Sequence, residues 1–93
     1  MDTWEHPVIA QRELHRNDTA ITVSIGLPYR EFLLWYAPFR IDRAGDDPVL
    51  HSASGRDSLE AFQSAERMIG AMVHSWNADG AITWDGERDL GFR

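Results

Sequence analysis

The composition of the chain excludes several classes of protein. Its 93 residues are too few for two independent cores, so we expect residues 1–93 to form a single domain. The absence of cysteine excludes a disulfide framework and a thiolate metal site. A net charge of -6, with nine arginines scattered singly and no lysine, is unfavourable for binding nucleic-acid phosphates.

The hydropathy of the sequence predicts neither a membrane span nor a secretory signal. The longest near-apolar run, Phe32 to Phe39, is far shorter than a membrane span. The opening residues MDTWEHPVI have neither the basic region nor the apolar stretch that a secretory signal needs. We therefore expect a cytoplasmic protein that does not bind membranes.

The first part of the chain predicts a β-hairpin. Val8 to Arg16 forms the first strand, and Asn17-Asp18 is a turn signal. Ala20 to Gly26 then alternates apolar with polar residues, as a half-buried strand does. The first strand fits less well, because Arg12 shares one face with apolar residues such as Leu14.

Two more strands are expected before residue 55. Alternation in the segment FLLWYAPFRID predicts one face made of Trp35, Ala37, Phe39 and Ile41. The opposite face carries Leu34, Tyr36, Pro38 and Arg40. Pro38 cannot donate a ladder hydrogen bond, so this strand should lie at a sheet edge there or contain a bulge. After a loop, Val49 to Ala53 predicts a short fourth strand.

The stretch from Gly55 to Trp76 predicts one amphipathic helix. Asp57 or Ser58 is its N-cap, and Glu60 stands where the reciprocal partner of a capping box belongs. A rotation of about 100° per residue predicts one buried stripe made of Leu59, Phe62, Ala65, Ile69, Met72, Val73 and Trp76. A turn signal ends the helix, and Ala81 to Trp84 predicts a last short strand. The fold is therefore α+β: an antiparallel meander of three to four strands packed on one long helix, with a short C-terminal strand.

Two segments resemble a family of small bacterial proteins of unknown function. Its members carry a Trp-x-Cys/Ala-Pro-aromatic-x-Ile strand and a Gly-x-Asp-Ser-Leu-Gln-Ala-Leu helix start. This chain reads WYAPFRI at 35–41 and GRDSLEAF at 55–62. It departs from the pattern at Glu60, where Gln is usual, and at Glu66, where an apolar residue is expected. The resemblance implies a small α+β domain and no established activity, ligand or catalytic residue.

Glu66 interrupts the apolar stripe of the helix, and three interpretations are open. Its stem packs at the edge of the stripe while the carboxylate reaches water. Alternatively, it forms a buried ion pair with Arg12 or Arg40 on the sheet. In the third interpretation it is a catalytic carboxylate with a raised pKa. Gly70, one turn later, leaves room beside it.

No motif for a metal, a cofactor or catalysis accompanies this carboxylate. The four histidines, His6, His15, His51 and His74, lack the spacing of paired metal ligands on a helix. No phosphate loop, dinucleotide-binding fingerprint or nucleophile elbow occurs. We therefore expect no metal and no cofactor, and an enzyme is the less favoured hypothesis.

The most informative feature for function is a surplus of apolar surface. Leu34, Tyr36 and Pro38 point to the face that one helix cannot cover, and Trp84 also needs burial. Such a surface favours a protein-interaction module that forms a homodimer or binds a protein partner. The alternative is that the two termini fold back over this face. Two other functions stay open: an acidic immunity-type inhibitor of a basic toxin, and a small enzyme with its site between helix and sheet.

Overall fold

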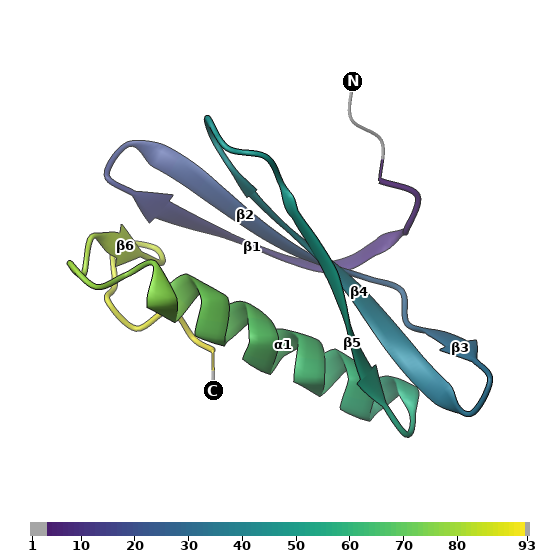
Figure 1. The fold of residues 1–93 in the computed structure, drawn as a ribbon. Coiled ribbons are helices and arrows are strands. Elements are labelled where there is room, and N and C mark those ends of the chain that lie inside the picture. Colours follow the sequence, from purple (N-terminus) through teal and green to yellow (C-terminus); the bar gives the residue numbers. More distant parts are fainter. Residues whose placement is uncertain (1–3, 93) are drawn as a thin grey trace.

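The computed structural model describes residues 4–92 and shows one helix packed on an antiparallel sheet of six strands (Figure 1). The α+β class is therefore confirmed. In chain order the elements are β1 (Val8–Arg16), β2 (Thr19–Gly26), β3 (Tyr29–Glu31), β4 (Leu34–Arg43), β5 (Val49–Gly55), α1 (Ser58–Ser75) and β6 (Ile82–Thr83).

The sheet is not the simple meander of three to four strands that the sequence predicted. β4 has β5 along one edge, and on its other edge β3 pairs with residues 34–36 and β2 with residues 39–43. β1 and then β6 continue the sheet beyond β2. The additional strand, β3, has three exposed residues, so no alternation of apolar and polar side chains marked it in the sequence.

Pro38 lies at the gap between β3 and β2. At this position β4 has a strand neighbour only on the β5 side, where Pro38 stands opposite Ser52. A residue without an N–H is tolerated at such a place, because a strand edge needs no second ladder of hydrogen bonds. β4 is thus locally an edge strand at the position where the sequence predicted one.

The core lies between α1 and the face of the sheet that α1 covers. Cross-strand register explains its composition: Val23 lies opposite Ile41 and Ile25 opposite Phe39, so the apolar residues of β2 and β4 share one face. The buried apolar residues of the strands are Leu14, Ile21, Val23, Ile25, Ala37, Phe39, Ile41, Ala53 and Ile82. The alternation read from the sequence therefore identified the inward side of both long central strands.

The buried stripe of α1 is rotated from the predicted one. Its buried residues are Ala61, Ala65, Ile69 and Val73, which follow one another at intervals of four. Leu59, predicted at the start of the stripe, is 64% exposed. The sequence pattern missed this rotation because it gives weight to large side chains, whereas two alanines allow α1 to approach β4 and β5 closely.

A tight turn joins β5 to the start of α1. The Asp57 side chain accepts the backbone N–H of Glu60 at 2.7 Å, which confirms Asp57 as the N-cap. The Glu60 carboxylate accepts hydrogen bonds from the side chain and the backbone N–H of Arg56, and these bonds lower the pKa of Glu60. Gly55 is required because a Cβ there would lie 2.4 Å from the backbone nitrogen of Ala61.

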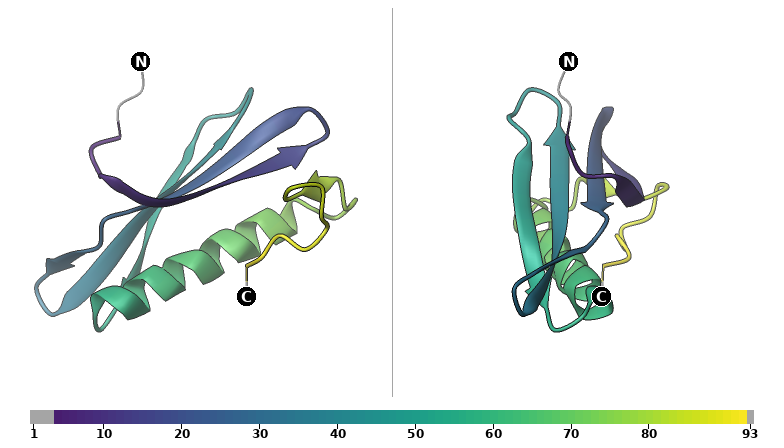
Figure 2. Two further views of the ribbon diagram at one scale, coloured as in Figure 1. Left: turned by 180° about the vertical axis from the view of Figure 1, so that it is seen from behind. Right: turned by 90° about the vertical axis from the view of Figure 1, so that its right-hand side faces the viewer.

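The segment after β6 folds back along α1, on the side of the sheet that α1 occupies (Figure 2). A Cβ on Gly70 would lie 2.6 Å from the Cβ of Phe92, so the glycine makes room for this C-terminal tail. Gly91, with a φ of +78°, brings the tail against Trp84 and Arg12. The space beside Gly70 is therefore filled by Phe92.

We expect Gly70→Ala to destabilise the protein even though alanine is the better helix former. The new Cβ would meet Phe92, and displacing the tail should outweigh the gain in helix propensity, which is about 1 kcal/mol. Thermal denaturation followed by circular dichroism should show a lower melting temperature. In a Phe92→Gly background the Cβ that causes the clash is absent, so Gly70→Ala should raise the melting temperature there. A decrease in both backgrounds would contradict this packing of the tail.

Candidate functional site

Glu66 and Arg12 line one small cavity between α1 and the sheet. The cavity has a volume of about 80 Å³, and Phe62 and Phe92 also line it. The part of the chain that the structure describes contains no ion pair between Glu66 and either Arg12 or Arg40. Glu66 is half-buried and lines this cavity together with the two rings.

Arg12 is held by the C-terminal tail. Its guanidinium carbon lies 3.8 Å from the ring centroid of Trp84 and 5.1 Å from that of Phe92. Its Nη1 donates a hydrogen bond to the Leu90 carbonyl oxygen at 2.9 Å. These contacts explain why an arginine occupies the apolar face of β1, because a planar cation packs well against aromatic rings.

Arg40 lies on the face of the sheet away from α1. Its Nε donates to both carboxylate oxygens of Asp42 at 2.9 Å. On the same face Gln11 donates a hydrogen bond to the Ser24 hydroxyl at 3.0 Å. Because the helix covers the opposite face, the sheet itself separates Arg40 from Glu66. The centre of the open face is therefore polar.

We expect Arg12→Met to lower the free energy of unfolding by about 1–3 kcal/mol, because it removes the contact with Trp84 and the bond to the Leu90 carbonyl. Glu66→Gln is the matched control in the same cavity. It breaks no ion pair with Arg12, so its effect should stay below about 0.5 kcal/mol. Urea denaturation measures both variants. A loss at Glu66→Gln as large as at Arg12→Met would show that the two charges stabilise each other.

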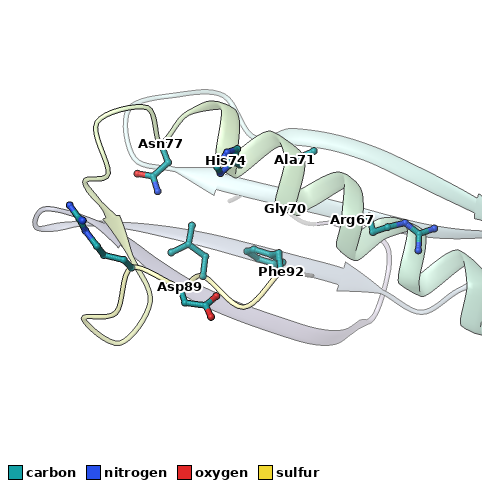
Figure 3. Close-up of a pocket in the computed structure, with 9 residues that line it drawn as sticks. Arg67, Gly70, Ala71, His74, Asn77, Asp89 and Phe92 are labelled. Carbon is teal, nitrogen blue, oxygen red and sulfur yellow. The ribbon is translucent and has the colours of Figure 1, made fainter.

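A wide hollow of about 610 Å³ lies between the second half of α1 and the C-terminal tail (Figure 3). Phe92 lies in its middle, with Arg67 towards one end and Asn77 towards the other. Its lining consists of Arg67, Gly70, Ala71, His74, Asn77, Arg88, Asp89, Leu90 and Phe92. Among these residues there is no hydroxyl or thiol nucleophile beside a base, which is the arrangement that covalent catalysis most often uses.

Metal-ion and membrane-spanning sites are not found within residues 4–92. No group of three or more His, Asp or Glu side chains in this range is placed to hold a metal ion. No helix in the same range is long and apolar enough to cross a bilayer. One of the four histidines, His51, stacks on Phe39 with ring centroids 5.7 Å apart.

The four residues predicted as a partner surface do not form one patch. Pro38 is buried and Tyr36 is half-buried on the face of the sheet away from α1. Trp84 is half-buried on the α1 side, where the Arg12 guanidinium lies over its ring. Leu34, at the start of β4, is 40% exposed.

A row of aromatic rings covers one end of the open face. Trp4 packs edge-on against His6, with ring centroids 5.3 Å apart. His6 stacks on Tyr29 at 5.9 Å, and Tyr29 stacks on Tyr36 at 5.7 Å. The beginning of the described chain, purple in Figure 2, thus folds back over part of this face, while the C-terminal tail lies on the α1 side. Because these contacts cover this part of the face, Tyr36 and Pro38 are not the candidate partner surface.

The most exposed large apolar side chains of the described residues lie at the tip of the β3–β4 hairpin. Phe32 is 89% exposed and Leu33 is 84% exposed. Phe32 also has a φ of +56°, in the left-handed region that a bulky residue rarely adopts. In Figure 1 this hairpin projects beyond the start of α1.

An apolar groove lies next to this hairpin, between the sheet and the start of α1. It has a volume of about 510 Å³, and it includes Leu59 and Leu27, which is 53% exposed. Together the tip residues and the apolar groove residues form what we call the apolar end: Phe32, Leu33, Ile9, Leu27, Pro28, Trp35, Leu59 and Phe62.

Sequence reasoning missed the apolar end because it placed Phe32 and Leu33 inside a strand. Phe32, Leu33 and Leu34 form a run without alternation, and the charged pair Arg30-Glu31 comes directly before it. Those two features together were the available signal of a turn. Nothing in the sequence marked the groove, whose residues come from four separate segments.

The fold and these surfaces define a small α+β domain with an exposed apolar end. A family model for a domain of unknown function, DUF6968, matches residues 10–93, so the chain belongs to that family. Membership of a family of unknown function is therefore confirmed, and no activity comes with it. No curated protein and no solved structure matches the chain.

We expect Phe32→Gly to leave the melting temperature unchanged or to raise it, at protein concentrations low enough to exclude self-association. Glycine adopts a φ of +56° without the cost of about 1–2 kcal/mol that a side chain incurs, and the ring is almost fully exposed. Phe32→Ala is the matched control, because it removes the ring and keeps the strain. It should melt below Phe32→Gly. A melting temperature for Phe32→Gly below that of the wild type would show that the ring stabilises the monomer.

Proposed function

We propose that the protein is a non-enzymatic interaction module that binds another protein through its apolar end. The exposure of Phe32 and Leu33 is the observation that carries this proposal. Contiguous exposed apolar surface marks interaction sites on small proteins. Aromatic side chains are also enriched at the centres of protein interfaces, where they contribute much of the binding energy.

The hairpin tip is unfavourable for the isolated chain. Burial of a side chain of this size gains about 1.5–3 kcal/mol, and neither Phe32 nor Leu33 obtains that gain within the monomer. The left-handed backbone at Phe32 adds a cost of about 1–2 kcal/mol. Closing the hairpin does not require this residue, since Gly or Asn suits a positive φ better. A partner that buries the ring would offset both costs.

Charge near the apolar end favours this reading over the acidic-inhibitor alternative. Arg30 and Arg56 stand beside Glu31, Asp57 and Glu60 in the sequence, so the two signs nearly balance in the segments that flank the site. An inhibitor of a basic toxin would instead concentrate acidic residues at its binding surface.

We also propose that segments 35–41 and 55–62 are the signature of the family. Both segments contain residues with specific structural roles. Pro38 lies at the gap between β3 and β2, and Gly55 and Asp57 form the turn and the N-cap of α1. Trp35 and Phe62, from the same segments, line the apolar groove. A cytoplasmic location fits a chain without cysteine.

Site-specific photo-crosslinking in the expressing cells tests the proposed function. A benzophenone amino acid at position 32 should form a covalent adduct with a protein, either a second copy or a different chain. The matched control places the same amino acid at Gln63, which is exposed on α1 outside the apolar end. Equal yields at the two positions, or no adduct at position 32, would contradict the proposal.

A further inference from the structure

We infer that the partner of the apolar end is a second copy of this chain, with the hairpin tip of each protomer seated in the apolar groove of the other. The inference rests on the proposed function, because it names the occupant of the same site. The β3–β4 hairpin lies next to the start of α1 (Figure 1), and Trp35 of β4 and Leu59 of α1 both line the groove. A two-fold axis that passes between tip and groove therefore places the tip of each protomer in the groove of the other, as in an isologous dimer.

The presence of an exposed apolar tip and an apolar groove on the same chain supports a second copy over an unrelated protein. Phe32 and Leu33 are exposed at the tip, and the groove is an open apolar hollow of about 510 Å³. Neither tip residue lines that groove in its own chain, so the projection and the hollow are both unfilled in the monomer. An identical molecule supplies the missing half of each contact.

The area available at the apolar end is sufficient for a weak homodimer. The exposed parts of its large apolar side chains amount to roughly 100 Å² each, which is on the order of 600 Å² for each protomer. Two protomers together would bury about 1,200 Å², the lower bound for a specific interface. We therefore expect a weak, reversible dimer.

Charge also permits self-association at this end. The whole chain carries -6, so two copies repel one another at most orientations. The flanking segments hold Arg30 and Arg56 against Glu31, Asp57 and Glu60, which reduces the repulsion where the two apolar ends would meet. The side chain of Arg56 is 87% exposed, so it is available at the rim of such an interface.

Sedimentation equilibrium of the full chain tests the inference. The wild type should form a dimer whose dissociation constant rises at least 100-fold in a tip variant, Phe32→Asn with Leu33→Ser, and in a groove variant, Leu59→Ser with Leu27→Ser. Leu50→Ser is the matched control, because Leu50 is 56% exposed on β5, away from the apolar end. It should leave the dimer unchanged. Circular dichroism should show that all variants remain folded, since the replaced side chains are exposed.

A mixture of the tip variant and the groove variant gives the sharpest result. Neither variant alone retains an intact contact, because each homodimer lacks either both tips or both grooves. The heterodimer retains one intact contact, formed by the tip of the groove variant and the groove of the tip variant. Mixing should therefore restore association to a level between that of the wild type and that of either variant. Absence of this rescue would contradict the tip-in-groove arrangement.

Other outcomes separate this inference from the proposed function. A wild-type chain that stays monomeric while position 32 crosslinks to a different protein would overturn the second copy and leave the proposed function standing. A dimer that is insensitive to the tip variant would place the interface elsewhere, such as the outer edge of β5, and overturn the inference. Binding of the wild type, but not of the tip variant, to phosphatidylcholine vesicles without dimerisation would overturn both.

Discussion

A single helix on a broad sheet is the constraint on which the rest of the structure depends. The 18 residues of α1 pack mainly on β4 and β5 and much less on β2, so the helix covers only part of one face (Figure 1). The small residues Ala61 and Ala65 hold it close to those strands. Because apolar surface left in water is unfavourable, every region that α1 does not reach must be covered by another segment, made polar, or used for binding.

The regions that α1 does not reach differ in whether another segment covers them, polar residues occupy them, or they stay exposed. Next to β1, the C-terminal tail takes the place of a second helix, and Arg12 attaches it through aromatic rings and a carbonyl oxygen. On the opposite face, Trp4 and His6 cover the aromatic end, and the centre is polar. At the start of α1 no segment of the described chain covers Phe32 or the groove. This contrast within one molecule is why we assign that end to a partner.

Local patterns in the sequence predicted the parts of the structure whose contacts are local. The β1–β2 hairpin and the N-cap at Asp57 depend on neighbours a few residues away, so alternation and capping rules identified them. Arg12 looked like a defect in an apolar strand because its hydrogen-bond partner, Leu90, is 78 residues further along the chain. The apolar end escaped prediction for the same reason, since its groove forms only when four separate segments meet. Leu59 shows the remaining limit: helical spacing identifies a stripe, but the rotation of the helix depends on how closely the sheet lets it approach.

Backbone amide NMR spectra recorded over a dilution series test most directly whether the uncovered end of the sheet is occupied by a second molecule in solution. The account predicts that signals from residues 27–35 and 58–62 move together as the concentration rises, while those from β5 and the C-terminal tail stay in place. Spectra that are independent of concentration into the millimolar range, or changes confined to β5, would contradict it.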